Sequence, residues 1–73
     1  MPYRLTHLRR ADVSRIALAE HVDPLALKQH GYESARALGD AHALWLRSEQ
    51  PGVLFELRCR GGDALLIEKP ATH

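Results

Sequence analysis

The sequence of 73 residues lacks the features that mark several protein classes. It has one cysteine, Cys59, so no disulfide can form within the chain. Apolar runs such as 43–46 and 64–67 are far shorter than the roughly 20 residues that a membrane-spanning helix needs. The opening residues, Met1 to Arg4, do not resemble a secretion signal. We therefore expect a protein of the reducing cytoplasm that has no membrane partner.

Size and charge limit the function further. The formal net charge is only +1, and a chain this short buries about 60% of the surface that its unfolded form exposes. A deep catalytic pocket within one copy is therefore not expected. Hydrophobic residues make up 45% of the chain, which predicts folding rather than disorder. We expect one small domain over residues 1–73, with a frayed tail at 71–73.

Charge is concentrated near the N-terminus. Residues 1–15 contain four arginines and one aspartate, a net charge of +3, which leaves −2 for residues 16–73. A basic segment on a nearly neutral body can attract nucleic acid or an acidic protein surface, and it can equally be a solvated edge. The near-neutral total is lower than in most dedicated nucleic-acid-binding domains.

Helical periodicity is clearest over residues 34–48. At 100° per residue, Leu38, His42 and Trp45 share one broad arc with several small and apolar residues. This pattern predicts an amphipathic helix that ends before Pro51 and Gly52. We expect Trp45 and Leu38 to anchor the core.

The C-terminal third changes to an alternating pattern. Residues 53–60 alternate apolar and polar side chains, and residues 64–69 continue after Gly61, Gly62 and Asp63, which together predict a β-hairpin. A three-residue loop, 61–63, with a glycine in the left-handed region places Leu57 and Cys59 opposite Ile67 and Leu65. The same face of the hairpin is expected to contain Phe55 and to pack on the helix.

Signals in the first half are weaker. Residues 3–8 alternate and predict a strand that joins the hairpin. Asp12 could cap a helix that runs to about His21, and Asp23 followed by Pro24 predicts a short helix over 24–30 that stops at Gly31. The predicted fold is a small α+β domain of order β-α-α-α-β-β, in which the C-terminal hairpin packs on an amphipathic helix.

No pattern of catalytic or metal-binding residues is recognisable. The five histidines include no His-x-x-x-His pair, and Cys59 has no Cys-x-x-Cys partner, so the spacing of a zinc site is missing. On an apolar strand face, the Cys59 thiol is expected to behave as a small hydrophobe. Gly61 and Gly62 precede a strand, whereas a phosphate loop precedes a helix. We predict no enzymatic activity, no metal and no cofactor.

Two kinds of partner stay open. The first prediction is a small interaction module that docks on a larger protein as an adaptor or inhibitor. This module is also predicted to form a homodimer, through a sheet edge or through the apolar Leu54 and Leu66 on the outer face. The alternative is a nucleic-acid-binding regulator, because helices followed by a hairpin resemble a winged helix. In either case the predicted contact residues are Arg9, Arg10, Arg58 and Arg60.

Overall fold

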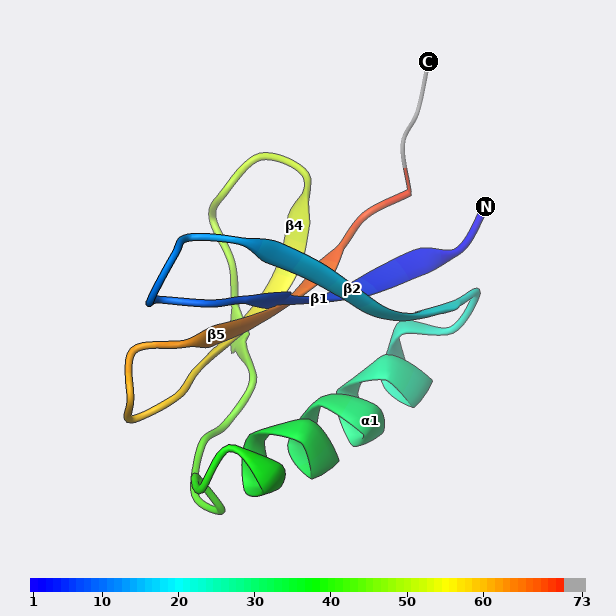
Figure 1. The fold of residues 1–73 in the computed structure, drawn as a ribbon. Helices are drawn as coiled ribbons and strands as arrows, with labels where there is room; N and C mark the ends of the chain where they lie inside the picture. The colour runs from blue at the N-terminus through cyan, green and yellow to red at the C-terminus, as the bar shows by residue number, and fades with distance from the viewer. Residues whose placement is uncertain (71–73) are drawn as a thin grey trace.

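A computed structural model of the chain describes residues 1–70 and contains one helix and five strands, in the order β-β-α-β-β-β (Figure 1). The elements are β1 Tyr3–Leu8, β2 Arg15–His21, α1 Pro24–Ala37, β3 Leu46–Arg47, β4 Val53–Arg58 and β5 Ala64–Glu68. The predicted frayed tail, 71–73, lies outside the described residues. The fold is a small α+β domain, but the predicted order with three helices is wrong.

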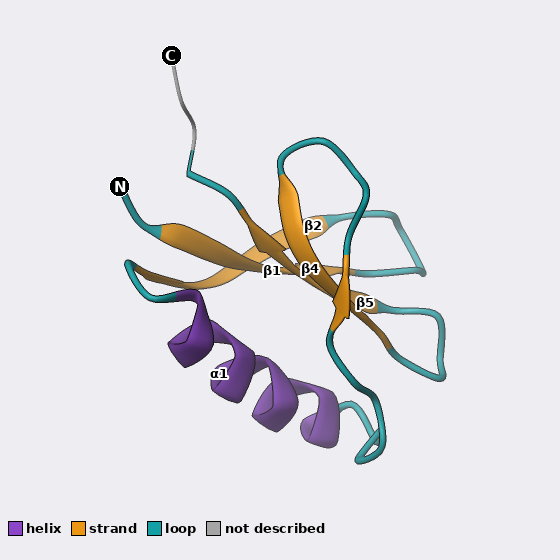
Figure 2. Ribbon diagram, turned by 180° about the vertical axis from the view of Figure 1, so that it is seen from behind, coloured by secondary structure: helices purple, strands orange, loops and turns teal. Residues whose placement is uncertain are grey.

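The strands form one antiparallel sheet in the order β2-β1-β5-β4-β3. The helix packs on one face of this sheet, below β1, β2 and β5, and Figure 2 shows the other face without a helix. The predicted strand 3–8 is confirmed as β1, and it lies beside the C-terminal hairpin as expected. With only one helix, the winged-helix arrangement is absent from residues 1–70.

The predicted helix 12–21 is instead a turn followed by strand β2. Residues such as Ala17, Leu18 and Glu20 favour helix by intrinsic propensity, but pairing with β1 overrides that weak preference. The β1–β2 register shifts at Leu18, where Ala17 pairs with Thr6 and Ala19 pairs with Leu5. This bulge interrupts the regular alternation, which concealed the strand pattern.

Helix α1 begins where its sequence predicts but does not stop at Gly31. The Asp23 side chain accepts a hydrogen bond from the Leu25 amide at 3.0 Å, with Pro24 following directly. Gly31 lies inside the helix, where the ring of Trp45 packs directly over it, and a Cβ at position 31 would overlap that ring. Trp45 Nε1 also donates a hydrogen bond to the Lys28 carbonyl oxygen at 2.9 Å.

The predicted helix 34–48 is wrong beyond Ala37. Gly39 has φ +89°, and the Gly39 and Asp40 amides donate to the carbonyls of Arg36 and Ala35, which is the hydrogen-bond pattern of a glycine-terminated helix. Residues 40–45 form a loop that leads to β3. Leu38 is therefore 44% exposed and does not anchor the core, whereas Trp45 packs against it from the loop.

The hairpin β4–β5 forms with a three-residue loop, one residue earlier than predicted. Cys59 and Asp63 close the loop, since the Cys59 amide donates to the Asp63 carbonyl oxygen at 2.8 Å, and Gly62 has φ +99°. Leu57 therefore pairs with Leu65 rather than with Ile67. The shift equals one full side-chain repeat, so the apolar residues keep their predicted face.

The core lies between the sheet and the helix. Seven buried residues form it: Leu5, Leu27, Ala35, Leu57, Cys59, Leu65 and Ile67. Partly buried aromatic side chains, including those of Tyr32 and Trp45 in an edge-to-face pair, complete its margin.

Candidate functional site

The β1–β2 turn (9–14) and the β4–β5 turn (59–63) meet at one end of the sheet (Figure 1). They meet because β1 pairs with β5, so β1 and β4 run in the same direction. The Arg10 side chain passes so close to Gly62 that a Cβ there would overlap it. We call Arg9, Arg10, Arg58 and Arg60, which these turns and the end of β4 carry, the arginine edge.

Asp63 joins the two turns. Its Oδ1 accepts a hydrogen bond from the Arg10 amide at 3.1 Å, and its Oδ2 lies 2.8 Å from Nε2 of His7. An ionised carboxylate can only accept, so Nε2 of His7 carries the shared hydrogen. One side chain on the hairpin thus holds both the end of β1 and the start of the β1–β2 turn.

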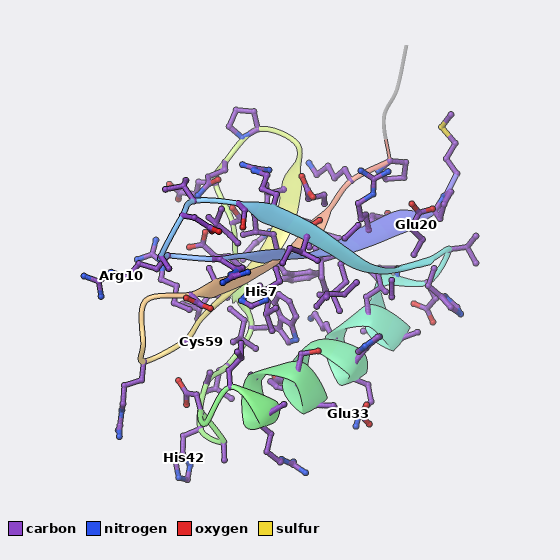
Figure 3. The ribbon with its side chains drawn as sticks, in the orientation of Figure 1. His7, Arg10, Glu20, Glu33, His42 and Cys59 are labelled. Atoms are coloured by element: carbon purple, nitrogen blue, oxygen red, sulfur yellow. The ribbon has the colours of Figure 1, made fainter. Side chains whose placement is uncertain are left out.

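Asp40 holds the third segment at this end, the loop between α1 and β3. Its Oδ2 accepts from the Arg60 amide at 2.8 Å, and its Oδ1 accepts from the His42 amide at 3.1 Å. Figure 3 shows His42 on this loop and Arg10 projecting from the turns at the same end, with Glu20 at the far end of the sheet. Two aspartates therefore fix the backbone positions of Arg10 and Arg60.

Hydrogen bonds keep the turn carboxylates ionised. The Arg10 amide and His7 lower the pKa of Asp63, and the amides of Arg60 and His42 lower the pKa of Asp40. The hydroxyl and amide of Ser14 lower the pKa of Asp12 in the same way. Stabilisation of the charged form by donated hydrogen bonds is the common cause.

The guanidinium groups are less engaged than these carboxylates. Among residues 1–70, no carboxylate oxygen lies within 4.0 Å of the side-chain nitrogens of Arg10 or Arg60. Arg9 Nε is 3.9 Å from Asp12, at the limit of an ion pair. Arg58 instead pairs with Glu56 at 3.0 Å. Arg9, Arg10 and Arg60 thus gather at the turns, whereas Arg58 lies on the sheet face that the helix leaves open.

Cys59 lies near this end but is not activated. Burial raises the pKa of its thiol, and the negative charges of Asp40 and Asp63 raise it further. The protonated thiol is a poor nucleophile. Within the described part of the chain, no group of three His, Cys, Asp or Glu residues could hold a metal ion. No helix over residues 1–70 has the length and apolar character needed to cross a membrane.

The surfaces predicted to form the dimer, Leu66, Leu54 and the sheet edges, offer a partner little to bind. Leu66 is only 3% exposed in a single chain, so it offers a partner almost no surface, and Leu54 is half-buried. Both sheet edges carry features that oppose strand pairing: β2 has the bulge at Leu18, and β3 has only two residues. Self-association stays a prediction.

Comparison of the chain with family models, with curated proteins and with solved structures found no match. The sequence pattern indicated the four arginines but not the residues that hold the backbone of two of them, Asp63 for Arg10 and Asp40 for Arg60. Their role depends on contacts with segments 20 and 53 residues away. A local signal did exist for the turn itself, because Asp12 and Ser14 have the spacing of a side-chain-closed turn.

Proposed function

We propose that the protein is a non-enzymatic interaction module that docks on a larger protein, with the arginine edge in contact with an acidic surface of that partner. The observation that carries the proposal is the arrangement at the turns. The carboxylates there bind backbone amides, while the guanidiniums of Arg10 and Arg60 have no carboxylate partner within residues 1–70. Arginine is enriched at protein interfaces, where its planar group binds carboxylates through two hydrogen bonds.

The surroundings of the arginines favour a protein over nucleic acid. Asp12, Asp40 and Asp63 stand among them with lowered pKa values, so this end carries both signs of charge rather than the continuous positive surface that a phosphate backbone favours. Exposed apolar side chains, Val13 and Leu38, adjoin the same end. A mixed apolar and arginine surface is typical of protein contacts, whereas phosphate contacts gain nothing from apolar groups.

The test compares two double variants with equal loss of charge. Arg10→Ala with Arg60→Ala removes the unpaired guanidiniums, and Arg4→Ala with Arg47→Ala removes two arginines outside the arginine edge. Proteins that co-purify from a native-host extract after nuclease treatment are identified, purified and titrated against each variant. We expect the first pair to weaken the Kd about tenfold or more, as interface arginines often do, and the control pair to leave it nearly unchanged.

A nucleic-acid partner would give a different result. The chain would then bind a 20-base-pair DNA or RNA duplex, nuclease would remove the bound material, and affinity would fall steeply as salt rises. Such binding, or a protein partner that the Arg10 and Arg60 variant binds as tightly as the parent, would overturn the proposal.

A further inference from the structure

Val13, in the β1–β2 turn, has an unusual backbone conformation. Its φ is +56°, and among non-glycine residues of the described chain it alone has a positive φ. The left-handed region brings Cβ close to the following carbonyl oxygen, and a β-branched side chain makes that contact worse. Glycine or asparagine is the usual residue at such a position.

The turn holds Val13 in this conformation from both sides. Oδ1 of Asp12 accepts hydrogen bonds from both the amide and the hydroxyl of Ser14, at 3.1 and 2.6 Å. The Arg9 amide donates to the Ser14 carbonyl oxygen at 2.9 Å. Together with the bond between the Arg10 amide and Asp63, these contacts fix the turn around Val13. The surroundings therefore impose the strained conformation.

Folding gains little from the valine side chain. Val13 is 75% exposed, so most of the residue stays in contact with water and its burial contributes little to folding. A residue that is strained and also exposed costs stability without contributing to the core. Such a cost is typical of functional positions, where the residue serves contact with a partner.

We infer that Val13 is the apolar anchor of the docking surface, entering an apolar pocket on the larger protein while Arg9, Arg10 and Arg60 bind carboxylates around the rim of that pocket. This inference rests on the proposed function. A central apolar contact surrounded by charged and polar contacts is the usual organisation of a protein interface. The guanidinium groups of Arg10 and Arg60, which have no carboxylate partner within residues 1–70, supply positive charge near Val13, and acidic groups on the partner's rim would complement them.

The first test needs no partner. Val13→Asn places a residue that tolerates the left-handed region at the same position, and the matched control is Val22→Asn, since Val22 is 71% exposed with an ordinary negative φ. We expect the first substitution to raise the thermal midpoint by about 4 °C or more, as relief of left-handed strain in a domain of this size should do. The control is expected to leave the midpoint nearly unchanged. Equal midpoints for the two variants would overturn the inference, because Val13 would then carry no strain.

The second test identifies what Val13 touches. A photoreactive aliphatic amino acid that bears a diazirine replaces Val13 in one protein and Val22 in another, and each is irradiated in native-host extract. The adducts are isolated under denaturing conditions and mapped by mass spectrometry. Support requires a nuclease-resistant protein adduct from position 13 but not from 22, on a partner segment with apolar side chains next to Asp or Glu. An adduct with nucleic acid, equal adducts from both positions, or none from position 13 would contradict the inference.

The arginine variants separate the two proposals. If Arg10→Ala with Arg60→Ala abolishes the adduct from position 13, both the arginine contact and the apolar anchor are supported. If the adduct persists in that variant, the anchor stands and the arginine contact is wrong. If the partner still needs the two arginines but position 13 yields no adduct, the anchor alone is wrong.

Discussion

The two faces of the sheet bury apolar side chains in different ways. On one face the helix and the loop carrying Trp45 cover Leu5, Leu57 and Ile67 with apolar groups. On the open face, Leu66 is nearly as well buried, yet its register neighbours are Thr6 and Glu56. Leu5, Leu57 and Ile67 belong to the apolar core cluster, whereas Leu66 lies outside that cluster and has one polar and one charged register neighbour.

The open face has its own polar network. Thr6 donates a hydrogen bond to one carboxylate oxygen of Glu68, and Arg15 Nη1 donates to the other at 3.2 Å. Arg4 pairs with Glu20 at 3.3 Å on the same face. A small sheet with one helix can therefore shield its second face without a second layer of helices. It follows that an apolar residue on an outward strand face is poor grounds for predicting a dimer.

Leu65 and Leu66 are neighbours on β5 and point to opposite faces of the sheet. Leu65→Ala should lower the free energy of unfolding by about 4 kcal/mol, because a closely packed core collapses little around the cavity. Leu66→Ala should cost about 2 kcal/mol, since flexible charged side chains can settle into the space. Urea unfolding measures both. Equal losses would mean that the open face is as rigidly packed as the core.

The contact between Gly31 and Trp45 tests how closely the helix-covered face is packed. Gly31→Ala should lower the unfolding free energy by about 2 kcal/mol, because a displaced ring outweighs the higher helix propensity of alanine. Gly61→Ala is the matched control, since a Cβ at that position meets nothing within 4 Å, and its effect should stay within about 0.5 kcal/mol. A stabilised Gly31→Ala variant would show that Trp45 does not dock on the helix.

Acidification should weaken the turn end as its aspartates become protonated. The folded pKa values of Asp12, Asp40 and Asp63 lie below the ordinary value, so their stabilisation is present above the unfolded pKa of about 3.9 and is lost as pH falls through the lowered values. We expect the Arg10 and Arg60 amides to lose protection from hydrogen exchange as Asp63 and Asp40 are protonated, in NMR spectra recorded from pH 5 downward. Asp63→Asn should make the acid-induced loss of stability shallower; an unchanged pH profile would exclude Asp63 from it.

Local chemistry predicted those elements whose signals act within a few residues. Asp23 and Pro24 predicted the helix start, and alternation predicted β1 and the apolar face of the hairpin. Gly39 carried the signal for the helix end, but the apolar arc that continued to Trp45 concealed it. Gly31 gave the opposite error, because a glycine can stop a helix or admit a neighbouring ring, and only the position of Trp45 distinguishes these roles.

In the candidate site, too, some residues could be predicted from local sequence and others could not. The four arginines could be selected from the sequence because charge belongs to the residue, and the predicted strand 3–8 pairs with the hairpin, which brings the two turns together. The roles of Asp63 and Asp40 could not be selected, since each binds an amide from a distant segment. The sequence also contains no sign that Val13 adopts a left-handed conformation.

Capping, alternation and charge are local properties, so the order of amino acids was enough to indicate a small α+β domain, the start of its helix, the hairpin and the residues that carry positive charge. Contacts between distant segments were needed to establish that 15–21 is a strand, that the helix continues through Gly31, and that Leu66 is buried. Each of these depends on a partner supplied by another part of the chain: β1 for the strand, Trp45 for the glycine, and Thr6 and Glu56 for the leucine. Such pairings overcome local preferences of a few tenths of a kcal/mol per residue, about the size of intrinsic propensity differences.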